Sequence, residues 1–547
     1  MPVTKEFPIF GKAVYVLLLL IAVVVIYGQF LWNPILFDDL PFFMVDNAGN
    51  QPVSNYHFSL FELRSLPYAT LAWTKAWFGL DLINFRVGNL LLHASAVLAL
   101  FSFLAELFAA VYGERSETDL SPRLAAFFAA LLFALHPVAT YATGYLVQRT
   151  IVMATLFGLL AMLCYVHGSI RQKPLWLWLS VPFYYLAVFS KEHAIMLPFA
   201  LLALTVLLHD DWRAKLKQRW GIFAALAVIA VIAMFVLLTK RGLLGSVYEI
   251  HAQELLGGID SQLSYPQSVI TQSWLFFKYA WLWLFPNPAW MSVDMREPFA
   301  RSLFSPYLVA TGCFVAWGVG AFWLLLKRGR VGLAGFALLF PWLMFFTEFS
   351  SVRIQEIFVL YRSYLWAAGA FCLLPVVFSR VNARVAAFIL TNIALAMFAI
   401  SMERLVTFSH PILLWDDAEK LVQGRSDLPG EYRIYYNRGT EYLKIDQYDM
   451  AISDLKRSIE LYADQPPAYG NLGWAYIKKR EMEQAVLAYN KAIQTNDDRK
   501  YPPHPKYHLG RAIAHEALKN WAAASADYKM ACKIDNKGCD RTNLPMK

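Results

Sequence analysis

Two adjacent carboxylates stand where the chain leaves its first long apolar segment. Asp38 and Asp39 directly follow Phe37, and carboxylates at a membrane edge are costly to remove from water. One interpretation is a solvated helix end, where aspartate is common. The other is a general base, or a carboxylate that orients one, acting on the hydroxyl of an acceptor. From these residues alone both interpretations stay open.

Further polar side chains recur near the ends of later apolar segments. Asn89 and His93 lie one helical turn apart and so share a face. Arg149, Lys191 and Arg362 could together hold a lipid phosphate, because guanidinium groups donate in a fork and an ammonium acts as a point charge. Any one of them alone is better explained as an anchor in ordinary lipid headgroups. What favours a site is that they gather on one side with further residues, namely Arg64, His136, Glu192 and Tyr361.

Other kinds of chemistry lack their motifs. The sequence contains no glycine-rich phosphate loop, no cysteine and histidine spacing for a metal, and no nucleophile elbow. Nothing therefore indicates nucleotide or nucleotide-sugar chemistry in a soluble fold. An activated substrate would have to come from the membrane, and we predict no metal site and no cofactor.

Membrane helices must position these residues. Of the 547 residues 58% are hydrophobic and 16% are charged, which is too apolar for a soluble protein of this length. A helix needs about 20 apolar residues to cross the hydrocarbon core. Eleven segments meet or approach that length, and they begin near Val14, Val87, Leu124, Ile151, Pro174, Ala194, Gly221, Pro306, Val331, Tyr364 and Val385.

Lysine and arginine in the short connections predict the orientation. With eleven spans the basic loops all fall on one side, which we take as cytoplasmic together with the N-terminus. The other side receives the loop 32–86, the segment 240–305 and the C-terminus. Within 240–305, Lys278 interrupts an apolar run at 274–285, so we predict an interfacial or re-entrant helix there. The net charge of +9 belongs to these loops and does not indicate a nucleic-acid partner.

The chain becomes repetitive after about residue 405. Tyr435-Tyr-Asn-Arg-Gly439-x-x-Tyr442 recurs 34 residues later as Tyr469-Gly-Asn-Leu-Gly473-x-x-Tyr476, the period of tetratricopeptide repeats. A third, looser copy begins at Leu509-Gly510. We predict a docking half-repeat in 406–432 and three repeats in 433–547, which would bind an extended peptide or a partner protein. Cys532 and Cys539 could form a disulfide in an oxidising compartment, and two unrelated thiols are equally compatible with the sequence.

Taken in order, these motifs resemble those of the integral-membrane glycosyltransferases of the C superfold (GT-C). Among them the chain looks most like the transmembrane-and-tetratricopeptide-repeat O-mannosyltransferases and their bacterial relatives. The resemblance rests on Phe37-Asp-Asp, Arg64-x-x-Pro67, Asn89-x-x-x-His93, Leu132-Phe-Ala-x-His136-Pro137, Gln148-Arg149, Ser190-Lys-Glu-x-Ala194-x-x-Leu197-Pro198 and Tyr361-Arg-Ser-Tyr-Leu365.

The resemblance implies an all-α protein of a bacterial inner membrane, with a GT-C-like helical bundle over 1–405 and a periplasmic repeat solenoid. It implies an inverting enzyme that moves a sugar from a polyprenyl-phosphate carrier to a hydroxyl of a protein or glycan. Asp38 or Asp39 would be the base, and the cations at 149, 191 and 362 would neutralise the leaving phosphate. The repeats would recruit a secreted or pilin-like acceptor protein. Lipid phosphate or substrate would also contact Arg64, His93, His136, Glu192 and Tyr361.

Two other functions stay open. A ligase or polymerase that acts on diphosphate-linked glycan would add a whole repeat unit instead of one hexose or pentose; relatives of that kind use a divalent metal. A non-catalytic scaffold of a secretion or envelope complex would tolerate alanine at the three cations and would need residues 411–547. A transporter is disfavoured because the spans carry few polar residues at mid-membrane.

Overall fold

The computed structural model of the protein describes residues 11–44, 52–112, 120–241, 245, 263–354, 356–425, 428–536 and 539–541. The chain divides into two compact units, Met1–His410 and Pro411–Lys547. In the described ranges the regular structure is helical apart from one isolated bridge between Met295 and Phe358. The all-α prediction is confirmed.

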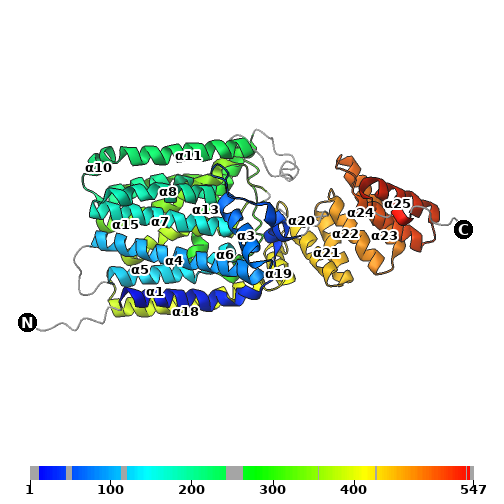
Figure 1. Ribbon diagram of the computed structural model, residues 1–547, viewed down its shortest axis with the longest axis horizontal. Helices are drawn as coiled ribbons and strands as arrows, with labels where there is room; N and C mark the ends of the chain where they lie inside the picture. The colour runs from blue at the N-terminus through cyan, green and yellow to red at the C-terminus, as the bar shows by residue number, and fades with distance from the viewer. Residues whose placement is uncertain are drawn as a thin grey trace, which may run out of the picture. The chain divides into compact units, whose positions relative to one another are not determined.

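The first unit is a bundle of long apolar helices that run alongside one another (Figure 1). Its long helices are α1 (Lys12–Tyr27), α4 (Leu82–Tyr112), α5 (Pro122–Ala134), α7 (Arg149–Arg171), α8 (Pro174–Ser190), α9 (Leu197–Leu208), α11 (Trp220–Arg241), α13 (Ser264–Leu284), α14 (Pro306–Leu326), α15 (Gly329–Phe345) and α18 (Ala383–Thr407). Between them lie the shorter helices α2 (Leu40–Phe43), α3 (Ser65–Phe78), α6 (Thr140–Thr143), α10 (Trp212–Gln218), α16 (Ser363–Ala370) and α17 (Leu374–Val377).

The predicted spans coincide with these helices. Among the described residues, eight helices are long and apolar enough to cross a membrane, or nine if the bent pair Pro122–Ala134 and Pro137–Thr143 is one span. Two shorter apolar helices, Pro174–Ser190 and Glu192–Leu208, correspond to the remaining predicted segments. The protein is therefore a multi-pass membrane protein. Residues 274–284 of the predicted apolar run form the second half of α13, where Lys278 pairs with Glu297.

Local sequence explains where the helices around the site begin and end. The hydroxyl of Ser121 accepts a hydrogen bond from the N–H of Leu124, which caps α5, and Pro122 occupies its first turn. Pro137 cannot continue a helix, so the chain bends by 51° into the 3₁₀ turn η4 (Pro137–Ala139) and α6. The segment between α6 and α7 is thereby carried across one end of the bundle.

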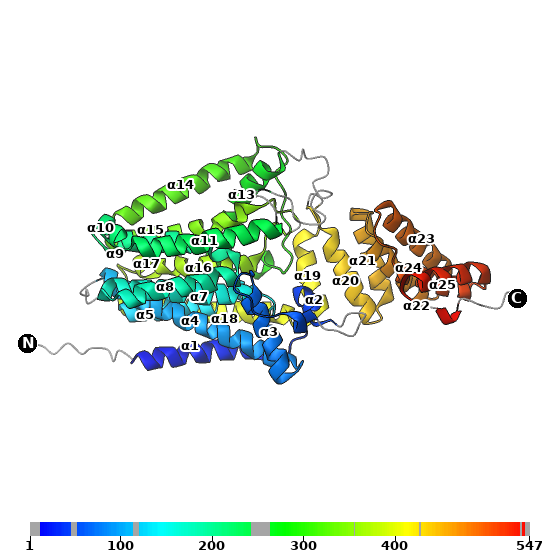
Figure 2. The same cartoon turned by 45° about the horizontal axis from the view of Figure 1, so that its top comes forward.

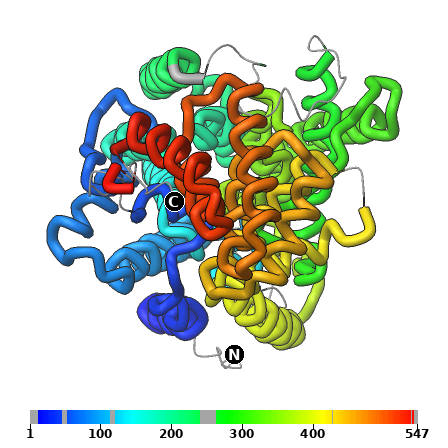
Figure 3. The backbone as a smooth tube through the Cα atoms, turned by 90° about the vertical axis from the view of Figure 1, so that its right-hand side faces the viewer, coloured from blue at the N-terminus to red at the C-terminus, as the bar shows by residue number. Residues whose placement is uncertain are grey.

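Figure 1 shows α3 and α6 at one end of this bundle and α10 at the other. Helices α14 and α15 form a hairpin (Figure 2). Helices α1 and α18, from opposite ends of the unit's sequence, lie side by side along one edge (Figure 3). The candidate site is built from elements at the α3 and α6 end.

The second unit contains α19 (Pro411–Val422) and three helix hairpins. These are α20 and α21 (Tyr432–Lys444, Tyr448–Leu461), α22 and α23 (Pro466–Lys478, Met482–Asp498), and α24 and α25 (Pro505–Ala517, Trp521–Asp535). Buried small residues, Gly439 and Gly473, let the helices of the first two hairpins approach closely.

The third hairpin is in regular register. Arg438 pairs with Asp454 and Arg511 pairs with Asp527, across the same 16-residue separation. That register gives the small-residue position of the third repeat to Ala512, which is fully buried. Our placement of Gly510 there was wrong by two residues. Gly510 has a different task, because a Cβ added at Gly510 or Gly473 would overlap the ring of Tyr489.

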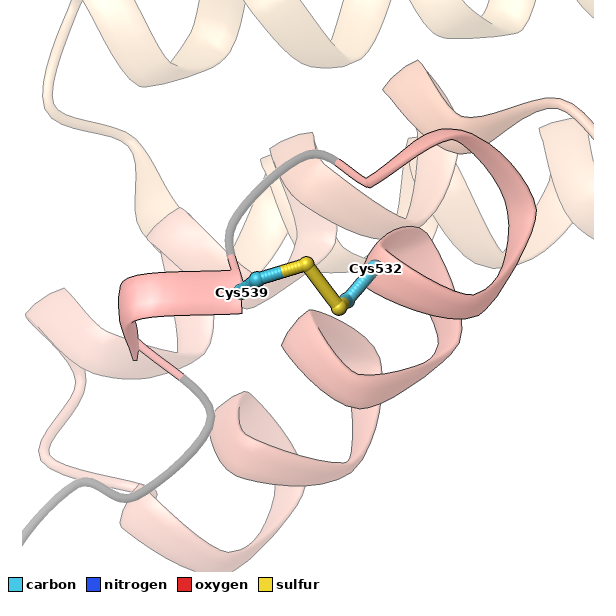
Figure 4. Close-up of a disulfide and its surroundings, with 2 residues drawn as sticks. All are labelled: Cys532 and Cys539. Carbon is cyan, nitrogen blue, oxygen red and sulfur yellow. A yellow bond between two sulfur atoms is a disulfide. The ribbon is translucent and has the colours of Figure 1, made fainter.

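A disulfide joins Cys532 in α25 to Cys539 in the 3₁₀ turn η10 (Cys539–Arg541), as Figure 4 shows. Of the two possibilities that the sequence left open, the structure contains the bonded pair. The link ties the chain after α25 back onto that helix.

Candidate functional site

The two adjacent aspartates have different surroundings. They lie in the 3₁₀ turn η2 (Phe37–Asp39). The Asp39 carboxylate is fully buried and accepts hydrogen bonds from the backbone N–H groups of Leu146 (2.9 Å) and Val147 (2.8 Å). Asp38 is only partly buried. Phe37 adopts a left-handed conformation with φ of 40°, which is uncommon for a bulky residue and occurs where surrounding structure imposes it.

Burial also changes the acidity of Asp39. Removal from water raises the pKa of its carboxyl from 3.8 to about 6, and this outweighs the two backbone hydrogen bonds and the charges of Arg86 and Arg149, which act in the opposite direction. Since both its oxygens accept backbone hydrogen bonds, Asp39 fixes η2 against the segment before α7. Asp38 is the more exposed carboxylate of the pair and accepts a hydrogen bond from the side chain of Gln148.

A chain of hydrogen bonds leads from Asp38 to Lys191. The side-chain amide of Gln148 donates from Nε2 to Oδ2 of Asp38 at 3.4 Å, and its Oε1 accepts from Nζ of Lys191 at 3.1 Å. Lys191 is buried in the turn between α8 and the 3₁₀ turn η5 (Glu192–Met196). Its Nζ also donates to Oγ1 of Thr150 at 3.3 Å and lies 4.8 Å from the ring centroid of Tyr361. The sequence separation of these groups is large, yet one end of the bundle brings them together.

An ion pair holds the loop 32–86 to the same turn. The guanidinium of Arg64 donates to both carboxylate oxygens of Glu192, with Nε 3.1 Å from Oε2. The backbone N–H of Arg64 donates to the carbonyl of Phe189 at 2.6 Å. Arg64 has a φ of 66°, so the backbone here is in the left-handed region. The start of α3 is thus attached to the end of α8.

Arg149 is directed away from Lys191. Its guanidinium donates to Oδ1 of Asn89 (2.7 Å), Oγ1 of Thr70 (3.0 Å) and the carbonyl of Phe85 (2.9 Å). A Cβ at Gly88 would overlap this guanidinium, so glycine makes room for it. Arg149 therefore links α3, α4 and α7.

Arg362 belongs to a buried ionic cluster behind the site. It donates to Glu348 at 3.0 Å and to Glu356 at 2.9 Å. Glu348, fully buried in the 3₁₀ turn η7 (Phe346–Ser350), also bonds Nε2 of His193 at 3.0 Å and lies 3.7 Å from Arg353. The three cations of the sequence prediction thus have separate sets of partners, and Lys191 is the one directly connected to Asp38 through a shared group.

The two predicted histidines lie in an aromatic layer. Nδ1 of His93 is 2.6 Å from the hydroxyl of Tyr364. The His136 ring stacks on Trp283, with 4.1 Å between centroids, and its two nitrogens bond the carbonyl of Trp283 (3.1 Å) and the N–H of Val138 (3.2 Å). Both rings are buried, and His93 together with Asn89 and Arg86 lines a small pocket.

Two residues of this region were missed as site residues. Gln148 stood in the Gln148-Arg149 motif, and its membership of that motif was the available signal. Glu348 follows an apolar run as a single acid, and no spacing in the sequence points to its partners.

Comparisons with known proteins agree with this architecture. The tetratricopeptide repeat family matches residues 432–465 and 466–499. The chain is 34% identical over 153 residues to protein O-mannosyl-transferase tmtc2 of Xenopus laevis, an alignment that covers 27% of this chain and 16% of that protein. It is 31% identical over 127 residues to protein O-mannosyl-transferase TMTC4 of Mus musculus, covering 21% and 17%.

Among solved structures the chain is similar to ArnT from Cupriavidus metallidurans bound to undecaprenyl phosphate, at 13% identity and a TM-score of 0.39, covering 95% of this chain and 80% of that one. The sequence matches span about a sixth of the length of the curated relatives. The predicted resemblance to the O-mannosyltransferases with tetratricopeptide repeats is confirmed: over about a quarter of its length, this multi-pass membrane protein with tetratricopeptide repeats is similar to the O-mannosyl-transferases tmtc2 and TMTC4.

Proposed function

We propose that the protein is a membrane glycosyltransferase that moves a sugar from a polyprenyl-phosphate carrier to a hydroxyl of a protein or glycan. One observation carries the proposal: a carboxylate, Asp38, and a buried ammonium, Lys191, are held by the same amide at one end of a membrane bundle. Glycosyl transfer from a lipid phosphate needs such a pair, a base for the acceptor and a cation for the leaving group.

In the proposed reaction the Asp38 carboxylate takes the proton of the acceptor hydroxyl. The acceptor oxygen then forms a bond to the anomeric carbon while the bond from that carbon to the phosphate oxygen breaks. The departing phosphate keeps the electron pair, and Lys191 stabilises its charge. Direct displacement inverts the anomeric centre. We assign Tyr361, Arg64 and Glu192 to the substrate pocket, and Asp39, Arg149 and Arg362 to its support.

We further propose that the enzyme lies in a bacterial inner membrane with the site and the repeats on the periplasmic side. The Cys532–Cys539 disulfide supports this orientation, because disulfides persist in oxidising compartments. The helix hairpins α20 to α25 would recruit the acceptor protein.

The test compares intact masses of secreted proteins from wild-type cells, deletion cells and cells carrying Asp38→Asn in the full chain. We expect an increment of one hexose or pentose in wild type only, and a loss of about 10²- to 10⁴-fold in transfer rate with Asp38→Asn in purified protein. Asp210→Asn, in the Asp210–Arg328 pair near α10, is the matched control. Full activity of Asp38→Asn would overturn the base assignment, and an increment of a whole glycan unit would favour the ligase.

A further inference from the structure

We infer that Gln148 is a positioning residue that keeps the proposed base and the proposed phosphate-binding cation apart within one site. The inference rests on the proposed function, because it assigns a task to the group between Asp38 and Lys191. Gln148 itself touches no reacting atom in this scheme.

The surroundings of Gln148 determine how its amide is oriented. The side chain is 5% exposed, and its carbonyl and NH₂ groups face an ammonium and a carboxylate respectively. A flipped amide would point NH₂ at the ammonium of Lys191 and oxygen at the carboxylate of Asp38, and both contacts would be repulsive. The backbone of Gln148 is anchored at the start of α7, where its carbonyl accepts from the N–H of Ile151 at 3.0 Å.

The amide of Gln148 prevents direct contact between the carboxylate of Asp38 and the ammonium of Lys191. A carboxylate that meets an ammonium directly loses basicity, and the ammonium is no longer available to a phosphate. Gln148 forms one hydrogen bond with Asp38 and one with Lys191. Because the amide carries no charge, it neutralises neither the carboxylate nor the ammonium. Thr150, two residues further along in α7, holds Lys191 from a second direction. The hydroxyl groups of Tyr145 and Tyr361 also lie within electrostatic range of Asp38, and Asp39 is the adjacent carboxylate.

Two substitutions in the full chain separate this role from simple packing. Gln148→Glu puts a carboxylate beside Asp38 and opposite Lys191. We expect the acidic limb of kcat/KM to move to higher pH, and binding of undecaprenyl phosphate to weaken about tenfold. Gln148→Leu removes both hydrogen bonds and lets Lys191 approach Asp38, so the limb should move to lower pH with a reduced maximal rate. Gln172→Leu, at the C-terminal end of α7, is the control; it removes a hydrogen bond to the carbonyl of Ser169 and one from Nζ of Lys215.

The inference is overturned if both Gln148 variants keep the wild-type pH profile. It is also overturned if the acidic limb of kcat/KM moves in the same direction in Gln148→Glu and Gln148→Leu. Failure of the proposed function looks different: wild type transfers no sugar, or Asp38→Asn retains activity. In that case the binding measurement still decides, because unchanged affinity of Gln148→Glu for undecaprenyl phosphate would show that Gln148 does not control Lys191.

Discussion

The carboxylate of Asp39 accepts a 2.8 Å hydrogen bond from the backbone N–H of Val147, 108 positions further along the chain. A second bond from Leu146 makes the contact bidentate. This attachment holds η2 against the start of α7, and it is the reason that Asp38, the preceding residue, meets Gln148.

Asp39→Asn should change how stability depends on pH. Because burial raises the pKa of Asp39 from 3.8 to about 6, the folded state favours the protonated form. The stabilisation that the protonated Asp39 carboxyl gives the folded state is fully present below about pH 4 and is lost as the pH rises through about 6. The free energy of unfolding changes by about 3 kcal/mol over this range. We expect the stability of Asp39→Asn relative to wild type to increase by that order between pH 4 and 7. Thermal unfolding in detergent checks this, and a pH-independent difference would contradict it.

Glu348→Ala should be strongly destabilising. The substitution removes the acceptor that Arg362 and His193 share and leaves Arg362 with Glu356, and removing one partner of a buried ion pair costs about 3–5 kcal/mol. The measurement is the melting temperature of the purified protein together with its amount in the membrane. Glu403→Ala is the control, since this exposed partner of Arg404 should contribute at most about 1 kcal/mol. Equal melting of the two variants would argue against the cluster's role.

Arg64→Gly and Arg64→Ala should differ although both remove the ion pair with Glu192. The backbone at Arg64 is left-handed, with φ of 66°, which glycine tolerates and alanine does not. We expect the glycine variant to be more stable than the alanine variant by about 1 kcal/mol. Thermal unfolding measures this, with protease cleavage of the loop 32–86 as a second readout. If Arg64→Ala is as stable as Arg64→Gly or more stable, the backbone at Arg64 is not left-handed.

The disulfide is open to chemical counting. Denatured but unreduced protein should take up three alkyl groups, at Cys164, Cys313 and Cys372, and five after reduction. Cys532→Ser with Cys539→Ser should lower the stability of the last hairpin by about 2.5 kcal/mol, from the closure entropy of this short loop. Hydrogen exchange of α25 measures the loss. Five alkylations without reduction would show that the bond does not form.

The membrane helices could be predicted because their signal is local. A run of apolar residues specifies a helix wherever it lies, and prolines such as Pro122 and Pro174 mark the first turns of α5 and α8. The third repeat was misread by two residues for a related reason. Glycine and alanine both suit a close helix contact. The signal that distinguishes the registers, an arginine 16 residues before an aspartate as in Arg438 and Asp454, was overlooked at Arg511 and Asp527.

The candidate site was predictable as a set of residues and not as a set of partners. Residue types and motif order indicated Asp38, Lys191 and Tyr361, which the fold brings close. The same signals could not predict that Arg149 donates a hydrogen bond to Asn89, 60 positions away, or that Arg362 forms an ion pair with Glu348. The sequence position of a charged residue does not identify the residue that will pair with it in the folded protein.

The ring of Tyr489 lies against two glycines from consecutive hairpins, Gly473 and Gly510. This limits how freely the solenoid can be lengthened or recombined. A hairpin grafted after α23, or duplicated from elsewhere in the array, stacks there only if it presents a residue without a side chain to that tyrosine. Tyr489 therefore restricts which hairpins can follow α23, both in engineered arrays and in arrays that arise by duplication.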